Sequence, residues 1–464
     1  MGPRHALLAI VLAGGVLRLL SAISVPFIFD EYMLATIADR VSLRPLNLPL
    51  HGDMHGAGGV YAVALGEFLA GPNVLGYRLM SVASGTALIW IVGRLGMRQF
   101  GSHVGLAAAA LIATNEYLIG ISHFATNEML YLALSSATVL AFLCALDQGG
   151  TVRYARVGLA VGLGLMTKEV LVLWLPLLAW ELAARRGWRA LFERGPLVAA
   201  LIVLLAVTPD LVWNLLLKAT SNDITGQGFV EQISRLGLSW SVRPTALFLR
   251  AFHESAVSEY PSMTSLPGGL LLAGAVGSLL LLRKPAIRMW LLLGWVPFLF
   301  FSFFGGQGEF WWADLAVVPF VLLTVASVAR LSPWLLLVVV CLSLPGAFNV
   351  TRASENCYPS AALSSGPLMV RCHAEQRVLI GDFPARDHAA LSRVGSMRLP
   401  VANYYEQRAT AYLAWLSNES TDPDAWPVAN VEGDRKGFLR VVPPEARAAE
   451  IARVQQILQA LRAP

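Results

Sequence analysis

Charged residues are scarce in this sequence. Asp, Glu, Lys and Arg make up 14% of its 464 residues, whereas 56% are hydrophobic. A water-soluble protein of this composition would expose large apolar patches, so a soluble class is excluded. Long uncharged runs recur along about three quarters of the chain, which predicts a polytopic helical membrane protein. The small net charge of +5 is explained by Arg in short loops and needs no nucleic-acid partner.

Cysteine is also rare, with four residues in the chain. Cys144 and Cys341 lie in apolar segments, where a lone cysteine usually packs as a small hydrophobic side chain. Cys357 and Cys372 lie in the polar C-terminal region. They could form a disulfide if that region is extracytoplasmic, and would otherwise be two free thiols. The sequence leaves both alternatives open.

The apolar segments predict about eleven transmembrane helices. The first, from about Ala6 to Phe29, is too long for a signal-peptide core and is predicted to be retained as a span. The two short apolar segments on either side of Thr167-Lys168-Glu169 are predicted to form a hairpin that reaches only part-way toward the outer face. The later segments lie at about 77–97, 104–121, 126–146, 157–167, 169–184, 197–217, 267–282, 289–304, 313–329 and 333–350.

In this predicted topology, basic residues fall mainly in the loops on one side of the membrane. A cytoplasmic N-terminus places thirteen of them in cytoplasmic loops and six in the opposite loops, as the positive-inside rule requires. The first set is Arg4, Arg94, Arg98, Arg153, Arg156, Arg185, Arg186, Arg189, Arg194, Arg283, Lys284, Arg288 and Arg330, and the second is Arg40, Arg44, Lys218, Arg235, Arg243 and Arg250.

An odd number of spans places the C-terminal region outside the cytoplasm. We therefore predict a transmembrane domain over residues 1–350 and a small extracytoplasmic α/β domain over residues 351–464, in a bacterial inner membrane. In the second domain, segments 377–382 and 398–403 are expected to be strands, and segment 445–462 has the periodicity of an amphipathic helix.

Polar residues from distant parts of the chain fall at the predicted outer face. Their convergence predicts a pocket that holds carboxylates and a few cations. Cations suit a phosphate, and a carboxylate suits a general base. A phosphate beside lipid implies a lipid-linked substrate, most often a lipid-linked sugar. The residues are Asp30, Glu31, His51, Asp53, His55, Arg78, Asn127, Glu128, Lys168, Glu169 and Glu309.

Simpler roles are also open for these residues. Asp30 and Glu31 could be an interfacial pair at a helix end, and Glu128 could favour a helix N-terminus. Lys168 could extend toward the interface, and Arg78 could contact a phospholipid headgroup. The His51, Asp53 and His55 cluster has metal-ligand side chains, but its spacing matches no standard zinc site. Neither a metal nor another cofactor is predicted.

Four blocks of the sequence resemble the GT-C superfamily of integral-membrane glycosyltransferases, close to the protein O-mannosyltransferases and the lipid A aminoarabinose transferases. They have the family's order and spacing within residues 1–185. The sequence departs from the family's pattern at two places. The tip of the hairpin is Thr-Lys-Glu, where family members often have Thr-Lys-Gly, and the stretch before a late span is GGQGEFWWAD. The blocks are FDEYMLATIADR, MHGAGGVYAVALGEFLAGPNVLGYRLMSVASG, FATNEMLYLALSSATVLAF and GLAVGLGLMTKEVLVLWLPLL.

The resemblance implies a polyprenyl-phosphate sugar donor, a periplasmic active site and inversion at the sugar carbon. Asp30 would be the catalytic base, supported by Glu31, with Glu128 as a second acidic group. Lys168 and Arg78 would face the donor phosphate. The resemblance also matches His55 to a family histidine, and Glu309 is a candidate for acceptor binding. The acceptor, whether glycan, lipid or protein, is open.

Two other classes stand beside this one. A transporter or flippase of a lipid-linked glycan precursor would carry mid-span charges and repeated halves, and the sequence shows few of the former and none of the latter. A non-catalytic envelope assembly factor would tolerate loss of the acidic and basic residues together.

Overall fold

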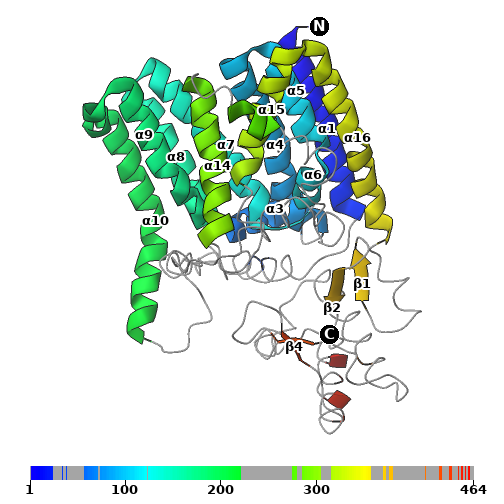
Figure 1. Ribbon diagram of the computed structural model, residues 1–464. Helices are drawn as coiled ribbons and strands as arrows, with labels where there is room; N and C mark the ends of the chain where they lie inside the picture. The colour runs from blue at the N-terminus through cyan, green and yellow to red at the C-terminus, as the bar shows by residue number, and fades with distance from the viewer. Residues whose placement is uncertain are drawn as a thin grey trace.

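A computed structural model of the chain describes residues 2–24, 57–71, 74–122, 124–220, 274–279, 285–304 and 315–356, four short strands beyond them, and a few single positions. The described residues before the strands are almost entirely helical and form a bundle (Figure 1). The elements are α1 (Pro3–Ser24), α3 (Gly58–Ala70), α4 (Val74–Phe100), α5 (Ser102–Thr114), α6 (Glu116–Ser122), α7 (Asn127–Gln148), α8 (Thr151–Thr167), η1 (Glu169–Leu173), α9 (Trp174–Arg186), η2 (Trp188–Phe192), α10 (Arg194–Thr220), α14 (Pro285–Phe304), α15 (Val317–Leu331) and α16 (Pro333–Asn356).

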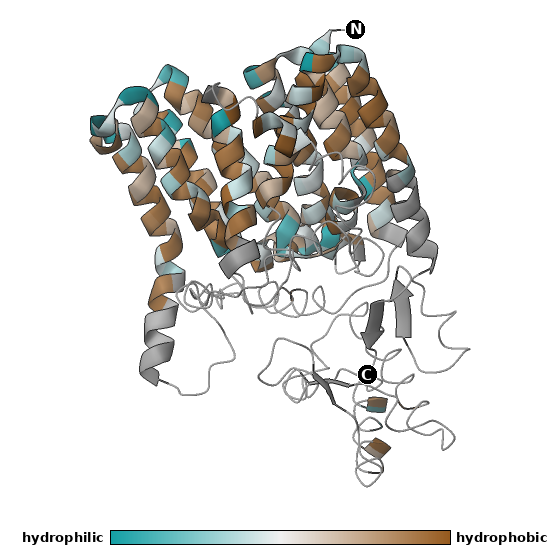
Figure 2. Cartoon of the chain, viewed as in Figure 1, coloured by the Kyte–Doolittle hydropathy of each residue, from teal (hydrophilic) through white to brown (hydrophobic). Residues whose placement is uncertain are grey.

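The helices follow the predicted apolar segments. In the described part of the chain, three stretches are long and apolar enough to cross a membrane, namely 3–22, 75–100 and 127–148, and six shorter apolar helices accompany them. Leucines on the outside of α1, α10 and α16 are exposed, as expected of surfaces that face lipid (Figure 2). The polytopic helical class is confirmed in this coarse form, whereas the number of spans stays a prediction.

The hairpin arm before Lys168 is longer than predicted. Helix α8 begins at Thr151, six residues before the predicted start, and its 17 residues are about 25 Å long. The apolar run underestimated the arm because Arg153 and Arg156 occupy the first turns of the helix. The glycine pair Gly149 and Gly150, both at positive φ, makes the tight turn from α7 into α8.

Small residues bring neighbouring helices close together. A Cβ at Gly96 of α4 would lie against the backbone of Gly105 in α5, and a Cβ at Gly158 of α8 would meet the backbone of Ala199 in α10. Lipid provides no hydrophobic force between helices, so membrane bundles depend on such close van der Waals contact. These contacts hold α4 against α5 and α8 against α10. They therefore fix where the ends of α4 and α8 lie.

The predicted span at 104–121 is not one continuous helix, because it is broken at Asn115. This residue has extended backbone angles and separates α5 from α6. Its side-chain oxygen accepts a hydrogen bond of 2.9 Å from the Leu118 N–H and so caps the start of α6. Hydropathy does not detect such a break, because both halves are equally apolar.

Arg18 satisfies the carbonyls that this break leaves without intrahelical donors. Its side chain is fully buried and donates to the carbonyl oxygens of Ile112 at 2.7 Å and Ala113 at 3.2 Å. It also donates to Ser122 Oγ at 3.0 Å and to the Gly14 carbonyl at 3.1 Å. A cation at a helix C-terminus is favoured by the macrodipole. Arg18 therefore joins α1, α5 and α6.

A proline in α14 also leaves a backbone carbonyl without its intrahelical donor. Pro297 has no N–H, so the carbonyl of Leu293 loses its usual donor. The indole N–H of Trp174 donates to this carbonyl at 2.9 Å. Trp174 is the first residue of α9, and this bond fixes the hairpin beyond Lys168 against α14.

Beyond the bundle, β1 (Met369–Cys372) pairs antiparallel with β2 (Gln376–Leu379), and β3 (Val428–Asn430) pairs antiparallel with β4 (Phe438–Arg440). Strand β2 overlaps the first predicted strand. Segment 398–403, the pairing of Cys357 and much of segment 445–462 lie outside the described residues. The α/β domain and its boundary stay predictions.

We expect Arg18→Met to lower the free energy of unfolding by about 3 kcal/mol, because it leaves several buried carbonyls without a charged donor. Denaturant titration of the detergent-solubilised protein measures this loss. The matched control is Arg98→Met, which removes a partly exposed arginine and should cost about 1 kcal/mol or less. Equal losses in the two variants would contradict the role given to Arg18.

Candidate active site

The predicted acidic and basic residues meet where α7 begins and α8 ends. Lys168 Nζ lies 3.4 Å from Glu128 Oε1, and the two side chains are 2% and 14% exposed. The ammonium also lies 5.7 Å from the centre of the Tyr131 ring, within range of a cation–π interaction. A buried ion pair of this kind is costly to form unless both charges are well partnered.

Local backbone structure explains why the two charges meet. Helix α8 ends because Lys168 is extended, at φ −155° and ψ 124°, while its N–H still donates to the Gly164 carbonyl at 2.9 Å. Glu128 lies in the first turn of α7, where a negative charge is favoured. Helices α7 and α8 run antiparallel through their glycine turn, so the end of one lies beside the start of the other.

Arg78 secures the end of α1 beside this site. It is fully buried, donates to the Ala22 carbonyl at 2.7 Å and lies 6.0 Å from the centre of the Phe124 ring. Pro26 cannot supply the N–H that would normally bond to Ala22, so Arg78 replaces that donor. Asp30 follows α1 by six positions.

The start of helix α3 packs against the same end of the bundle. A Cβ at Gly58 would lie 2.7 Å from Thr167 Oγ1, and a Cβ at Gly59 would overlap the Asn127 side chain. The first turn of α3 therefore packs directly on the residues that precede Lys168 and Glu128. Burial raises the pKa of Tyr61, one residue beyond this turn, above its usual value. A raised pKa keeps the Tyr61 phenol in its protonated form near neutral pH.

The structure brings Glu128 and Lys168 together and places Arg78 at the neighbouring end of α1. Glu169 is buried beside Lys168. Of the other predicted residues, Asp30, Glu31, His51, Asp53, His55 and Glu309 lie outside the described residues. No group of three metal-ligating side chains occurs among the described residues, and the expectation of a metal-free site stays a prediction.

Sequence reasoning missed Tyr131. Tyr131 lies three positions after Glu128, a spacing that places both on one helix face and could have identified it. Thr126 occupies the N-cap position of α7, and its side chain makes no capping hydrogen bond.

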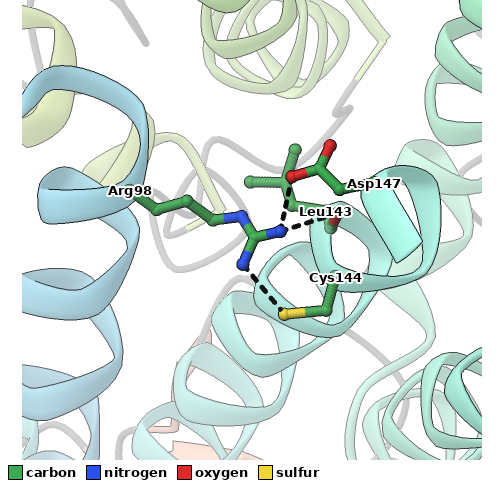
Figure 3. A network of polar contacts seen from close by, with 4 residues as sticks. All are labelled: Arg98, Leu143, Cys144 and Asp147. Carbon is green, nitrogen blue, oxygen red and sulfur yellow. Dashed lines mark hydrogen bonds and ion pairs between the residues drawn. The ribbon is translucent and has the colours of Figure 1, made fainter.

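The opposite end of the bundle has a different polar network, drawn in Figure 3. Arg98 Nη2 donates to Asp147 Oδ2 at 2.5 Å and to the Leu143 carbonyl at 3.3 Å, and Nη1 contacts Cys144 Sγ at 3.2 Å. Cys144 therefore accepts a hydrogen bond as well as packing in its helix. Arg78 and Arg98 lie near opposite ends of α4, so the site and this arginine network lie at opposite ends of the bundle.

Comparisons with known proteins give matches in sequence and in fold. The family described as dolichyl-phosphate-mannose-protein mannosyltransferase matches residues 55–213, which include Arg78, Glu128 and Lys168. The undecaprenyl phosphate-alpha-4-amino-4-deoxy-L-arabinose arabinosyl transferase of Edwardsiella ictaluri is 29% identical over 264 residues, which is 54% of this chain and 45% of the relative. The enzyme of the same name from Pseudomonas aeruginosa UCBPP-PA14 is 34% identical over 179 residues, which is 36% of this chain and 31% of the relative.

Two solved structures share the fold. ArnT from Cupriavidus metallidurans, bound to undecaprenyl phosphate, matches with a TM-score of 0.55 and 15% identity over 98% of this chain and 73% of its own. The archaeal oligosaccharyltransferase AglB from Archaeoglobus fulgidus, in complex with an inhibitory peptide and a dolichol-phosphate, matches with a TM-score of 0.52 and 13% identity over 88% and 59%.

The resemblance to the GT-C superfamily is confirmed. The sequence matches and the shared fold both support it. This GT-C-like chain spans less than half the length of the arabinosyl transferases that it matches. The matched segment is the part of the chain that positions the Lys168–Glu128 pair.

A double-mutant cycle tests whether this pair holds the site together. Lys168→Met leaves a buried carboxylate without its cation and should cost about 3–5 kcal/mol of unfolding free energy. Glu128→Gln should also destabilise. The double variant should lose less than the two single losses combined, by about 0.5–3 kcal/mol. Strict additivity in denaturant titration would argue against an interaction between the two side chains.

Proposed function

We propose that this protein is an inverting glycosyltransferase that moves a sugar from a polyprenyl-phosphate donor to an acceptor at the outer face of the membrane. The observation that carries the proposal is the buried Lys168–Glu128 pair, formed at the meeting point of α3, α7 and α8 within the segment that matches the mannosyltransferase family. The names of the relatives support a sugar donor carried on a lipid phosphate.

The proposed reaction is a single displacement. Asp30 removes the proton from the acceptor hydroxyl or amine while the acceptor atom attacks the anomeric carbon. The bond between that carbon and the phosphate oxygen breaks, and its electron pair leaves with the polyprenyl phosphate. Because the acceptor enters opposite the leaving group, the configuration at the sugar carbon inverts.

The charged residues have distinct roles in this proposal. Lys168 stabilises the negative charge that develops on the leaving phosphate. Arg78 assists by holding the end of α1, and hence the chain that leads to Asp30. Glu31 and Glu128 support the acidic side of the site, while His55 and Glu309 contribute to substrate binding. Divalent metal is not required in this mechanism.

Charge distribution supports an outer-face location. The last turn of α1 lies beside Arg78, so its first turn lies at the end of the bundle that contains Arg98. Arg185 and Arg288 contact Glu181 near the end of α9 and the start of α14. The excess of arginine at this end favours the cytoplasm, with the N-terminus, and the Lys168 end then faces outward.

The donor class can be narrowed further than the acceptor class. ArnT has been solved with undecaprenyl phosphate and AglB with a dolichol-phosphate, and both are polyprenyl phosphates. We propose the same class of carrier here, with an aminopentose or a hexose as the sugar. The acceptor is a glycan, a lipid or a protein. The relatives named above give no support to the transporter or to the assembly factor.

Asp30→Asn should reduce sugar transfer by about 10²- to 10⁴-fold, because the acceptor proton loses its base. Transfer is measured with the purified protein, radiolabelled polyprenyl-phosphate sugars and membrane extract as the source of acceptor. Asp147→Asn is the control, since it removes a carboxylate from the opposite end of the bundle and should leave transfer within about twofold. Wild-type turnover in Asp30→Asn would end the assignment of this base.

Lys168→Met should raise the donor KM about tenfold or more, because a charged hydrogen bond to phosphate is lost. Lys168→Arg retains the charge and should recover part of the affinity. Steady-state kinetics at varied donor concentration separate these effects from folding, provided that both variants elute as the wild type does in gel filtration. An unchanged donor KM in Lys168→Met would remove Lys168 from the phosphate site.

A further inference from the structure

The first turn of α3 is buried and has no side-chain cap from the described residues. Gly59 and Val60 are buried, and no side chain in the described part of the chain accepts from the N-terminal N–H groups of this helix. The first hydrogen bond of the turn runs from the Tyr61 N–H to the Ala57 carbonyl, at 3.0 Å. The N–H groups of Gly58, Gly59 and Val60 thus have no acceptor among the described residues.

Such groups need an acceptor from outside the helix. Buried backbone N–H groups are nearly always paired, because leaving one unpaired costs about as much as a lost hydrogen bond. The aligned peptide dipoles also concentrate partial positive charge at this turn. Together these properties favour an anion.

The charged residues of the site lie next to this turn. The two glycines pack against Thr167 and Asn127, as described above, and Lys168 and Glu128 are the next residues in the chain. The Lys168 ammonium has three N–H donors. It can therefore keep its contact with Glu128 and hold a second anion on another side.

Asn127 provides an independent sign of a ligand. Its side chain is 7% exposed, and its Oδ1 lies beside Gly59 with no hydrogen-bond partner among the described residues. Thr126 Oγ1, one residue earlier, is likewise buried and unpartnered in the described part of the chain. Buried polar side chains of this kind normally bond to a protein group, a water or a ligand.

We propose that the first turn of α3, bordered by Lys168 and Asn127, binds a phosphate group through the N–H groups of Gly58, Gly59 and Val60. This inference rests on the proposed function and specifies which atoms hold the donor phosphate. The backbone N–H groups donate hydrogen bonds to two or three phosphate oxygens, and Lys168 neutralises their charge. Asn127 can present its amide N–H to the phosphate or its oxygen to a neighbouring hydroxyl.

Val60→Pro tests the backbone donors directly. Proline is tolerated in the first turn of a helix, where its missing N–H has no intrahelical partner. Val60→Ala is the matched control, since it shortens the buried side chain but retains the N–H. We expect Val60→Pro to bind undecaprenyl phosphate about tenfold more weakly than Val60→Ala does. Binding is measured on the full chain in detergent, from the rise in Tm with ligand concentration.

Inorganic phosphate, added as a competitor, distinguishes the two sources of the phosphate group. Competition that is weaker in Val60→Pro supports a site that recognises free phosphate as well as the lipid. Binding of undecaprenyl phosphate alone, again weaker in Val60→Pro, supports a site that requires the lipid. Equal affinities in the proline and alanine variants, or no binding of either probe to the wild type, overturn the proposal.

Asn127→Asp provides a second test that does not depend on proline. The new carboxylate would lie against the free N–H groups and act as a permanent anion there. We expect a higher Tm than that of Asn127→Ala without ligand, and a smaller rise in Tm with undecaprenyl phosphate. A lower Tm together with an undiminished response to the ligand contradicts the site.

Failure of this inference can be told apart from failure of the proposed function. Normal kcat and donor KM in Val60→Pro would overturn the α3 site while leaving the glycosyltransferase in place. A wild-type protein that binds undecaprenyl phosphate in the predicted manner but transfers no sugar would overturn the function and leave the phosphate site.

Discussion

The structure depends on the requirement that backbone carbonyls inside a membrane bundle find hydrogen-bond donors. Water cannot supply them there, so each break in a helix needs a side chain from elsewhere. Arg18 donates to the end of α5, Arg78 to the end of α1, and Trp174 to the carbonyl exposed by Pro297. Each donor lies on a different helix from the carbonyl that it satisfies, so each bond also holds two helices together.

These bonds also explain how the site can be well positioned at the ends of helices. Ends are usually the least restrained parts of a helix, yet the end of α1 is held by Arg78 and the hairpin beyond Lys168 is held by Trp174. The Lys168–Glu128 ion pair then links the start of α7 to the end of α8. The exception is the first turn of α3, where buried backbone donors lack an acceptor among the described residues. An unsatisfied group beside a satisfied ion pair is the arrangement expected of a binding site.

The two ends of the bundle differ in the kind of charge pairing they contain. At the Arg98 end, Arg98 pairs with the exposed Asp147, which contributes little to stability, whereas Arg185 and Arg288 pair with the buried Glu181. At the Lys168 end, the described ion pair between Lys168 and Glu128 is buried, so each charge affects the other strongly. The buried Lys168–Glu128 pair fits the proposed function, in which this end of the bundle performs the chemistry.

The sequence by itself determined the helical membrane class, most helix positions, and the residues that could form a site, because hydropathy, prolines and isolated charges are local features. It also placed Lys168 at a turn, since the apolar runs on either side end there. Only the tertiary structure decided which of these residues meet: Glu128 lies 40 positions from Lys168, and Arg78 lies 56 positions from Ala22. The break at Asn115, the capping by Arg18 and the buried first turn of α3 also came from packing. Their physical reason is that a polar group's environment in a membrane depends on which helices surround it, and the linear order of residues does not contain that information.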